Sequence, residues 1–130
     1  ASGDRLDEQS PTILVVDDDA DLCAVLEETL QSRGYAVRTA QDGHEALGVL
    51  AKGSISLVLL DIRMPRQDGL AVLHQLQSAG SQIPVIVVTG VATEEEVEEA
   101  MSLGAQTCLR KPFSLNRLLT EVALALRSAA

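Results

Sequence analysis

The feature of this sequence that most limits its possible folds is a set of apolar runs, each of which ends at a polar residue. The runs and the residues that follow them are 13–16 with Asp17, Asp18 and Asp19, 57–60 with Asp61, 85–88 with Thr89, and the short run 108–110 with Lys111. Runs of this kind fit strands that are buried on both faces of a parallel sheet. The carboxyl ends of such strands share one edge, where open α/β sheets bind ligands.

Segments of helical period separate the runs, and residues 36–40 form a weaker additional strand. The apolar residues expected on the inward faces of the helices are Leu22, Val25, Leu26, Leu30, Ala46, Leu47, Leu50, Ala51, Leu73, Leu76, Val97, Ala100, Met101, Leu115, Leu118, Leu119, Val122 and Leu126. Ser114 has the character of a cap for the last helix. Strands that alternate with helices predict an α/β fold, a three-layer doubly wound sandwich with a five-stranded parallel sheet.

Length and charge limit the function. The chain has 130 residues, the size of one domain, with a polar lead-in over residues 1–10 (a linker or an expression remnant) before the domain at 11–130. The formal charge of −9 would repel a phosphate backbone, so we expect no direct binding of nucleic acid. The sequence contains neither a stretch as long as a membrane span nor a signal peptide, and we expect a cytoplasmic protein with no membrane partner.

Cys23 and Cys108 are the two thiols of the chain. They lack CxxC spacing and a nearby histidine cluster, which argues against both a disulfide scaffold and a zinc site. We therefore expect both side chains to serve in packing.

The acids at the strand ends predict a metal site. Asp17, Asp18 and Asp61 would repel one another unless a cation joined them, and oxygen ligands favour Mg²⁺. A carboxylate can also attack phosphorus, and Asp61 is the best placed to do so. Lys111 would then supply a positive charge, and Thr89 a hydroxyl donor, to the phosphoryl oxygens.

Taken in order, these residues resemble the receiver domain of two-component response regulators over residues 12–127. The motifs that carry the resemblance are Val15-Val16-Asp17-Asp18, Asp61-Ile62-Arg63-Met64-Pro65 with Asp68-Gly69, Val88-Thr89-Gly90, Gly104-Ala105 and Lys111-Pro112-Phe113. Any one of them alone would be weak, whereas the set in this spacing is specific.

The resemblance implies a mechanism and partners. Asp61 would accept a phosphoryl group from a sensor histidine kinase or a histidine phosphotransfer protein, and the backbone carbonyl of Arg63 would join the acids as a ligand of Mg²⁺. It also implies the flavodoxin-like strand order 2-1-3-4-5, a cis bond between Lys111 and Pro112, and a homodimer on activation as one outcome. The downstream effector is not indicated.

The chain departs from the family pattern at Cys108, where receivers commonly carry Tyr or Phe. Because a thiol is too small to fill that space, we predict that switching relies on the loop after Thr89 and the helix that follows it. Arg63 and Val91 occupy positions that tune phosphoryl lifetime in the family, and Arg63 could cover the phosphoryl group.

Simpler interpretations apply to other polar residues. Asp19 suits a helix cap better than a metal ligand, and Thr93 with Glu96 has the spacing of a capping box. Asp42 and Glu45 match no family residue, and we assign them to solvent.

Two other functions fit parts of the sequence. A haloacid-dehalogenase-type phosphatase would use Asp17 as its nucleophile, because Asp17 and Asp19 have the required Asp-x-Asp spacing. A receiver-like interaction module without phosphorylation is the second, with Cys108 in its favour. The presence of Asp17, Asp18, Asp61, Thr89 and Lys111 together favours a phosphorylated switch that is not a classical enzyme.

Overall fold

The computed structural model describes residues 10–64, 69–90 and 92–129, in which strands and helices alternate along the chain. The strands are β1 (Thr12–Val16), β2 (Ala36–Ala40), β3 (Leu57–Leu60), β4 (Val85–Thr89) and β5 (Thr107–Arg110). The helices are α2 (Ala20–Gln31), α3 (Gly43–Ala51), α4 (Gly69–Ser78), α5 (Glu94–Ser102) and α6 (Leu115–Ala129). Of the sequence motifs discussed above, Pro65, Asp68 and Val91 lie outside the described residues.

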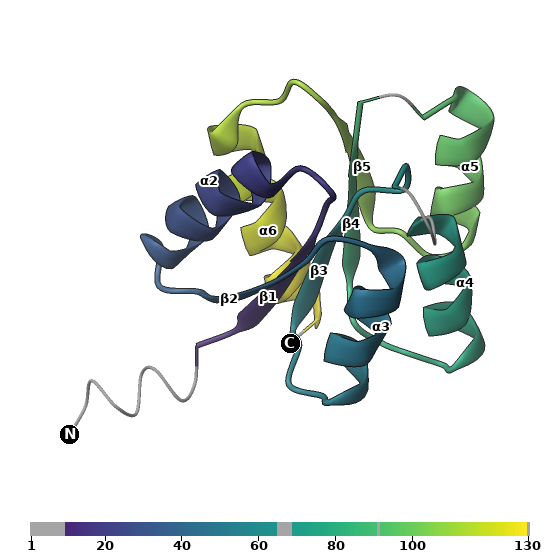
Figure 1. The fold of residues 1–130 in the computed structure, drawn as a ribbon, viewed down its shortest axis with the longest axis horizontal. Coiled ribbons are helices and arrows are strands. Elements are labelled where there is room, and N and C mark those ends of the chain that lie inside the picture. The colour runs from purple at the N-terminus through teal and green to yellow at the C-terminus, as the bar shows by residue number, and fades with distance from the viewer. Residues whose placement is uncertain (1–9, 65–68, 91, 130) are drawn as a thin grey trace.

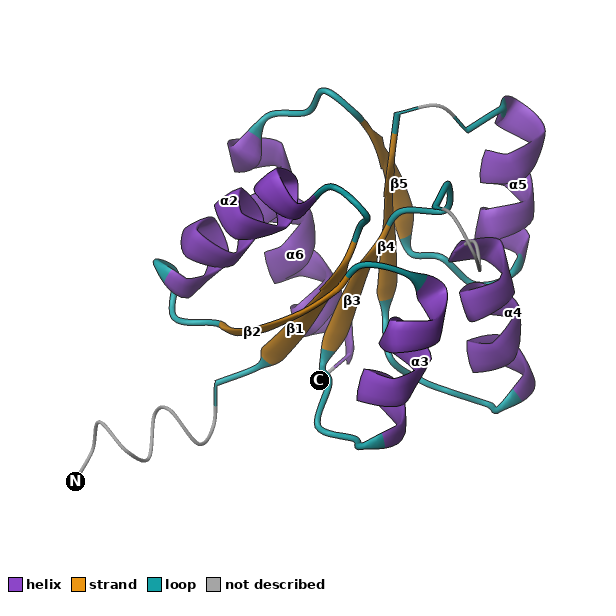
Figure 2. Ribbon diagram, in the orientation of Figure 1, coloured by secondary structure: helices purple, strands orange, loops and turns teal. Residues whose placement is uncertain are grey.

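The strands form one parallel sheet in the order β2-β1-β3-β4-β5, which confirms the predicted fold class and strand order. Figure 2 shows that the loops from β1 to α2 and from β5 to α6 leave the sheet at one edge, the upper edge in that view. The residues that end the strands are therefore collected at this edge.

Helices cover both faces of the sheet. In Figure 1, α2 and α6 lie on one face, and α3, α4 and α5 lie on the other. Because successive side chains of a strand point to opposite faces, each strand contributes to two separate apolar clusters. Leu14 and Val87 belong to the cluster on the α3–α5 side, whereas Val15 and Val88 belong to the cluster on the α2–α6 side.

Four of the side chains expected on inward helix faces are exposed, namely Val25, Ala51, Met101 and Leu115. Val25 in α2 is 48% exposed, and Met101 in α5 is 43% exposed. In α5 only a narrow stripe is covered, with Ala100 as its buried residue, so the neighbouring Met101 lies beyond the covered surface. Val25 instead lines a groove between α2 and α6.

Helix ends largely follow the capping expectations. Oδ1 of Asp19 accepts a hydrogen bond from the backbone N–H of Leu22, and Thr93 forms the capping box with Glu96 at the start of α5. The hydroxyl of Ser114 accepts the N–H of Arg117 at the start of α6.

The assignment of Asp42 and Glu45 to solvent was incomplete. Asp42 caps α3 by accepting the N–H of Glu45 at 2.8 Å. The carboxylate of Glu45 in turn accepts the N–H of Gln41. Both residues therefore serve the helix start, where a short acidic side chain satisfies free N–H groups.

The peptide bond between Lys111 and Pro112 is cis, as the resemblance implied. Within the described part of the chain, no helix combines the length and the apolar character that crossing a bilayer requires.

Candidate functional site

Three acids meet at the carboxyl edge of the sheet. Asp17 follows β1 and Asp61 follows β3, and these strands are neighbours. Asp17 is 3% exposed and Asp61 5% exposed, while Asp18 is open to solvent. One carboxylate oxygen of each acid lies within 4.8 Å of the others. The structure thus brings together the acids that the sequence indicated.

Backbone donors orient the two buried carboxylates. Oδ1 of Asp17 accepts the N–H of Asp19 at 2.9 Å, and Oδ1 of Asp61 accepts the N–H of Arg63 at 2.9 Å. These bonds tie each acid to the loop that follows its strand. Each carboxylate retains a second oxygen for another partner.

Lys111 is that partner for both acids. Its ammonium lies 2.6 Å from Oδ2 of Asp17 and 3.3 Å from Oδ2 of Asp61. Its backbone N–H donates to the carbonyl of Thr89, which links the end of β5 to the end of β4. The ammonium therefore contacts the same carboxylates that a bound metal ion would contact, and it lies close enough to Asp61 to reach a phosphoryl group attached there.

Burial and charge act against each other in this site. Burial of the Asp17 carboxylate raises its pKa, and the hydrogen bond from Lys111 offsets only part of that effect. Partial burial of the Lys111 ammonium lowers its pKa, but the adjacent carboxylates of Asp17 and Asp61 outweigh it, so the pKa of Lys111 is raised. The lysine therefore stays charged at neutral pH.

Thr89 ends β4 and is completely buried. Its hydroxyl has no hydrogen-bond partner among the described residues. A buried hydroxyl without a partner costs about 1–3 kcal/mol, and such groups are uncommon in folded proteins. The sequence pointed to Thr89 from its position, but it gave no sign that the hydroxyl would be unsatisfied.

Arg63 reaches away from the acids. Its Nε lies 3.5 Å from Oε1 of Glu96 in α5, and its side chain is 49% exposed. The guanidinium thus contacts α5 in this structure. The expectation that its backbone carbonyl binds a metal ion stays a prediction.

Gly69 is a residue of the site region whose role sequence reasoning missed. A Cβ atom added there would collide with the carbonyl oxygen of Asp61 and would lie 2.6 Å from Cα of Ile62. The start of α4 therefore packs directly on the backbone of the candidate phosphoacceptor. The sequence pointed to Gly69 as part of the family motif, and contact between two backbones cannot be deduced from a motif.

The oxygen donors fit a divalent cation. Two buried carboxylates and one exposed carboxylate, with no sulfur or imidazole among the clustered ligands, form the hard donor set that Mg²⁺ prefers. Burial raises the pKa of the Asp17 carboxyl group, the nearby charge of Asp61 adds a smaller contribution, and Lys111 offsets only part of these effects. A cation would supply further compensation of the negative charge.

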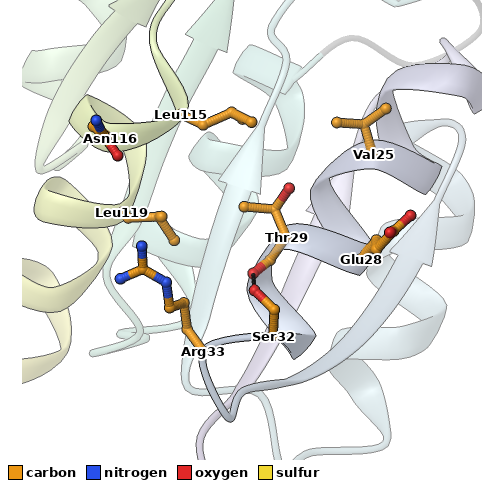
Figure 3. A pocket seen from close by; sticks show the side chains of 8 residues that line it. All are labelled: Val25, Glu28, Thr29, Ser32, Arg33, Leu115, Asn116 and Leu119. Atoms are coloured by element: carbon orange, nitrogen blue, oxygen red, sulfur yellow. Dashed lines mark hydrogen bonds between the residues drawn. The ribbon is translucent and has the colours of Figure 1, made fainter.

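A groove of about 460 Å³ lies between α2 and α6, away from the acids. In Figure 3, Val25 of α2 and Leu115 of α6 stand on opposite sides of it, with Thr29 and Leu119 further along. None of the clustered acids lines this groove, so it is distinct from the candidate site.

The chain belongs to the response regulator receiver domain family, whose model matches residues 13–123. The receiver domain therefore serves two-component signalling and is not a classical enzyme.

The curated relatives include the response regulator MprA of Mycolicibacterium vanbaalenii, 43% identical over 115 residues that cover 88% of this chain and 50% of that protein. MprA of Mycobacterium bovis is 41% identical over 118 residues, which cover 91% of this chain and 51% of MprA. The chain thus spans about half the length of the curated relatives it matches.

Solved structures support the same fold. A CheY-like receiver domain protein of Methanospirillum hungatei superimposes with a TM-score of 0.90 at 27% identity, covering 93% of this chain and 97% of that one. The receiver domain of NtrX from Brucella abortus gives a TM-score of 0.82 at 34% identity, covering 88% and 98%.

Proposed function

We propose that this domain is a phosphorylation-dependent switch in which Asp61 accepts a phosphoryl group from a phosphohistidine. The donor is a sensor histidine kinase or a histidine phosphotransfer protein, and a downstream effector reads the result. Like other receiver domains, this domain would act in the cytoplasm. The observation that carries it is the convergence of Asp61, Asp17 and Lys111 within hydrogen-bond distance, together with the buried hydroxyl of Thr89, which has no partner in the described part of the chain.

In the proposed transfer, an oxygen of Asp61 attacks phosphorus as the P–N bond of the donor breaks, and the imidazole leaves with the electron pair. Lys111, whose ammonium lies 3.3 Å from Oδ2 of Asp61, would then contact a negatively charged phosphoryl oxygen. Thr89 would donate its hydroxyl to another. Both groups stabilise charge by position alone, which is the main source of catalysis in phosphoryl transfer.

Asp17, Asp18 and Asp61, with the carbonyl of Arg63, would hold Mg²⁺. When bound, the ion would neutralise charge on the phosphoryl oxygens. Asp17 and Asp18 leave positions for water and phosphate, as Mg²⁺ sites commonly do. The carboxylate of Asp61 can then serve the ion and the reaction at the same edge of the sheet.

The phosphatase alternative is disfavoured by Asp19. That mechanism needs a carboxyl group free to act on the substrate, whereas Oδ1 of Asp19 accepts the N–H of Leu22 at 3.1 Å and caps α2. The module without phosphorylation gives no role to the buried hydroxyl of Thr89, which lacks a partner among the residues that the structure describes.

The test is the mass of the intact chain after incubation with acetyl phosphate, with Mg²⁺ or with EDTA. We expect a gain of one phosphoryl group that requires Mg²⁺ and disappears in Asp61→Asn. A gain that survives this substitution would move the acceptor to another acid, and no gain in the unaltered chain would favour the interaction module.

A further inference from the structure

Arg110 ties the end of β5 to the segment that enters α5. Its Nη1 donates a hydrogen bond to the carbonyl oxygen of Ala92 at 2.8 Å, across 18 residues of sequence. Ala92 is 5% exposed and directly precedes Thr93, the cap of α5. A charged donor on a partly buried carbonyl makes one of the stronger kinds of hydrogen bond.

Arg110 and Thr89 are also partners across the sheet. The two residues are in register between β4 and β5, so their side chains project from the same face. Val87 lies two residues before Thr89, and Cys108 lies two residues before Arg110, so all four side chains project from one face of the sheet. Val87 and Cys108 pack in the cluster on the α3–α5 side. The unsatisfied hydroxyl of Thr89 and the guanidinium of Arg110 therefore both belong to the layer that contains α5.

A second arginine contacts the start of the same helix. Arg63 pairs with Glu96, whose Oε1 also accepts the N–H of Thr93 at 2.9 Å in the capping box. The backbone N–H of Arg63 donates to Asp61. The start of α5 is thus connected by Arg63 to the loop of the candidate phosphoacceptor and by Arg110 to the strand that carries Lys111.

We propose that Arg110 is a positioning residue that holds Ala92 and the first turn of α5 in the unphosphorylated arrangement, with the pair of Arg63 and Glu96 as its second support. The proposal rests on the proposed function. Phosphorylation of Asp61 gives the Thr89 hydroxyl an acceptor, and movement of Thr89 toward it draws Ala92, three residues later, away from Arg110. The bond to Arg110 therefore opposes activation.

A contact that forms in only one of two conformations stabilises that conformation, and its free energy sets how far the ratio of the two conformations changes. For a hydrogen bond from a charged group that is partly open to water, loss of the contact corresponds to roughly a threefold to tenfold shift toward the activated arrangement.

Arg110→Met tests this, because it keeps most of the aliphatic stem and removes the guanidinium. Arg117→Met is the matched control: the same change at an arginine of α6, where the side chain is 62% exposed and lies 3.8 Å from Glu121. Glu96→Gln is the third variant, since glutamine keeps the acceptor for the N–H of Thr93 and removes the charge that faces Arg63.

The first measurement is amide hydrogen exchange in the chain without ligand. We expect faster exchange at residues 92–96 in Arg110→Met and none of this change in Arg117→Met. The second is the dissociation constant for beryllofluoride in Mg²⁺, a mimic of the phosphoryl group. It should fall roughly threefold to tenfold in Arg110→Met and by a smaller factor in Glu96→Gln.

Unaltered exchange at residues 92–96 in Arg110→Met overturns the role of Arg110. Weaker or unaltered binding of beryllofluoride in that variant, beside normal binding by the unaltered chain, overturns the opposition to activation. If the unaltered chain gains no phosphoryl group from acetyl phosphate, the proposed function fails, and the exchange result still decides whether Arg110 holds the start of α5.

Discussion

Lys111 is bonded more closely to Asp17 than to Asp61, with its ammonium 2.6 Å from the former and 3.3 Å from the latter. The lysine thus compensates the acid whose pKa burial raises, and only secondarily the acid that is the candidate phosphoacceptor.

Replacing Lys111 by methionine should therefore destabilise the domain in EDTA. Two buried carboxylates would lose their cationic partner, and we expect a fall of about 1–3 kcal/mol in the free energy of unfolding. Mg²⁺ should restore more stability to this variant than to the unaltered chain, because the ion replaces the missing charge. Urea titrations with and without Mg²⁺ measure both effects, and Lys52→Met at the exposed end of α3 is the control. Equal responses to Mg²⁺ would contradict the prediction.

Thr89→Val should stabilise the domain when no phosphoryl group is present. The substitution keeps the shape of the side chain and removes a buried hydroxyl for which the described residues supply no partner, so we expect a gain of about 1 kcal/mol. Thr93→Val is the informative contrast, because it removes the hydroxyl that caps α5 and should cost about 1 kcal/mol. Thermal unfolding of both variants gives the comparison. A loss of stability in Thr89→Val would show that the hydroxyl is already satisfied.

Gly69→Ala should disturb the site, whereas Gly48→Ala should not. The added methyl group at Gly69 would collide with the backbone of Asp61 and Ile62, and we expect a loss of about 1–3 kcal/mol together with slower phosphorylation. Nothing lies within 4 Å of the corresponding position at Gly48 in α3, so alanine there should stabilise the helix by about 0.5–1 kcal/mol. Chemical unfolding and acetyl phosphate kinetics would separate the two. Similar effects at both glycines would contradict the packing argument.

The stability difference between Asp17→Asn and the unaltered chain should depend on pH in EDTA. The pKa of Asp17 is raised in the folded state above its ordinary value of 3.8, so the folded chain holds this proton more tightly than the unfolded chain. Stability from this group is therefore full below the unfolded pKa and declines as pH rises through the folded pKa. Asparagine does not titrate, so the stability of Asp17→Asn does not decline with pH for this reason. The free energy of unfolding of Asp17→Asn relative to the unaltered chain should rise with pH through that window and then level off. A difference that falls with pH would reverse the sign of the shift.

The two thiols should react at very different rates. Cys23 is buried, and burial raises its pKa to about 11, while its Sγ lies 3.4 Å from the carbonyl oxygen of Asp17. Cys108 is partly exposed, so it should take up a maleimide first although burial also raises its pKa. Mass spectrometry should show one adduct on the native chain and two after unfolding. Cys108→Ser should remove the fast adduct, and a second fast adduct in the native chain would contradict the burial of Cys23.

The strand ends made much of the fold and the site predictable. Each apolar run stopped at a polar residue, and parallel strands place such ends at one edge, so the proximity of Asp17, Asp61 and Lys111 could be expected before any coordinates. The phosphoryl chemistry assigned to these residues stays a prediction, since proximity alone does not identify a reaction.

Other features depend on packing that no local pattern encodes. The helical period placed Val25 inward, but the spacing between α2 and α6 leaves it at the rim of a groove. The hydrogen bond from Arg110 to Ala92 joins residues from different elements, and its geometry depends on how β5 lies beside β4. The contact of Gly69 with the Asp61 backbone likewise exists only once α4 is docked.

The two apolar clusters share no residue, because the sheet backbone lies between them. Side chains that do not touch usually contribute independently to stability. The sequences of the helices on the two faces can therefore change at different rates during evolution. Each helix layer repacks only against the strand side chains on its own face. A protein engineer could likewise redesign the α2–α6 layer while keeping the packing beneath α5 as it is.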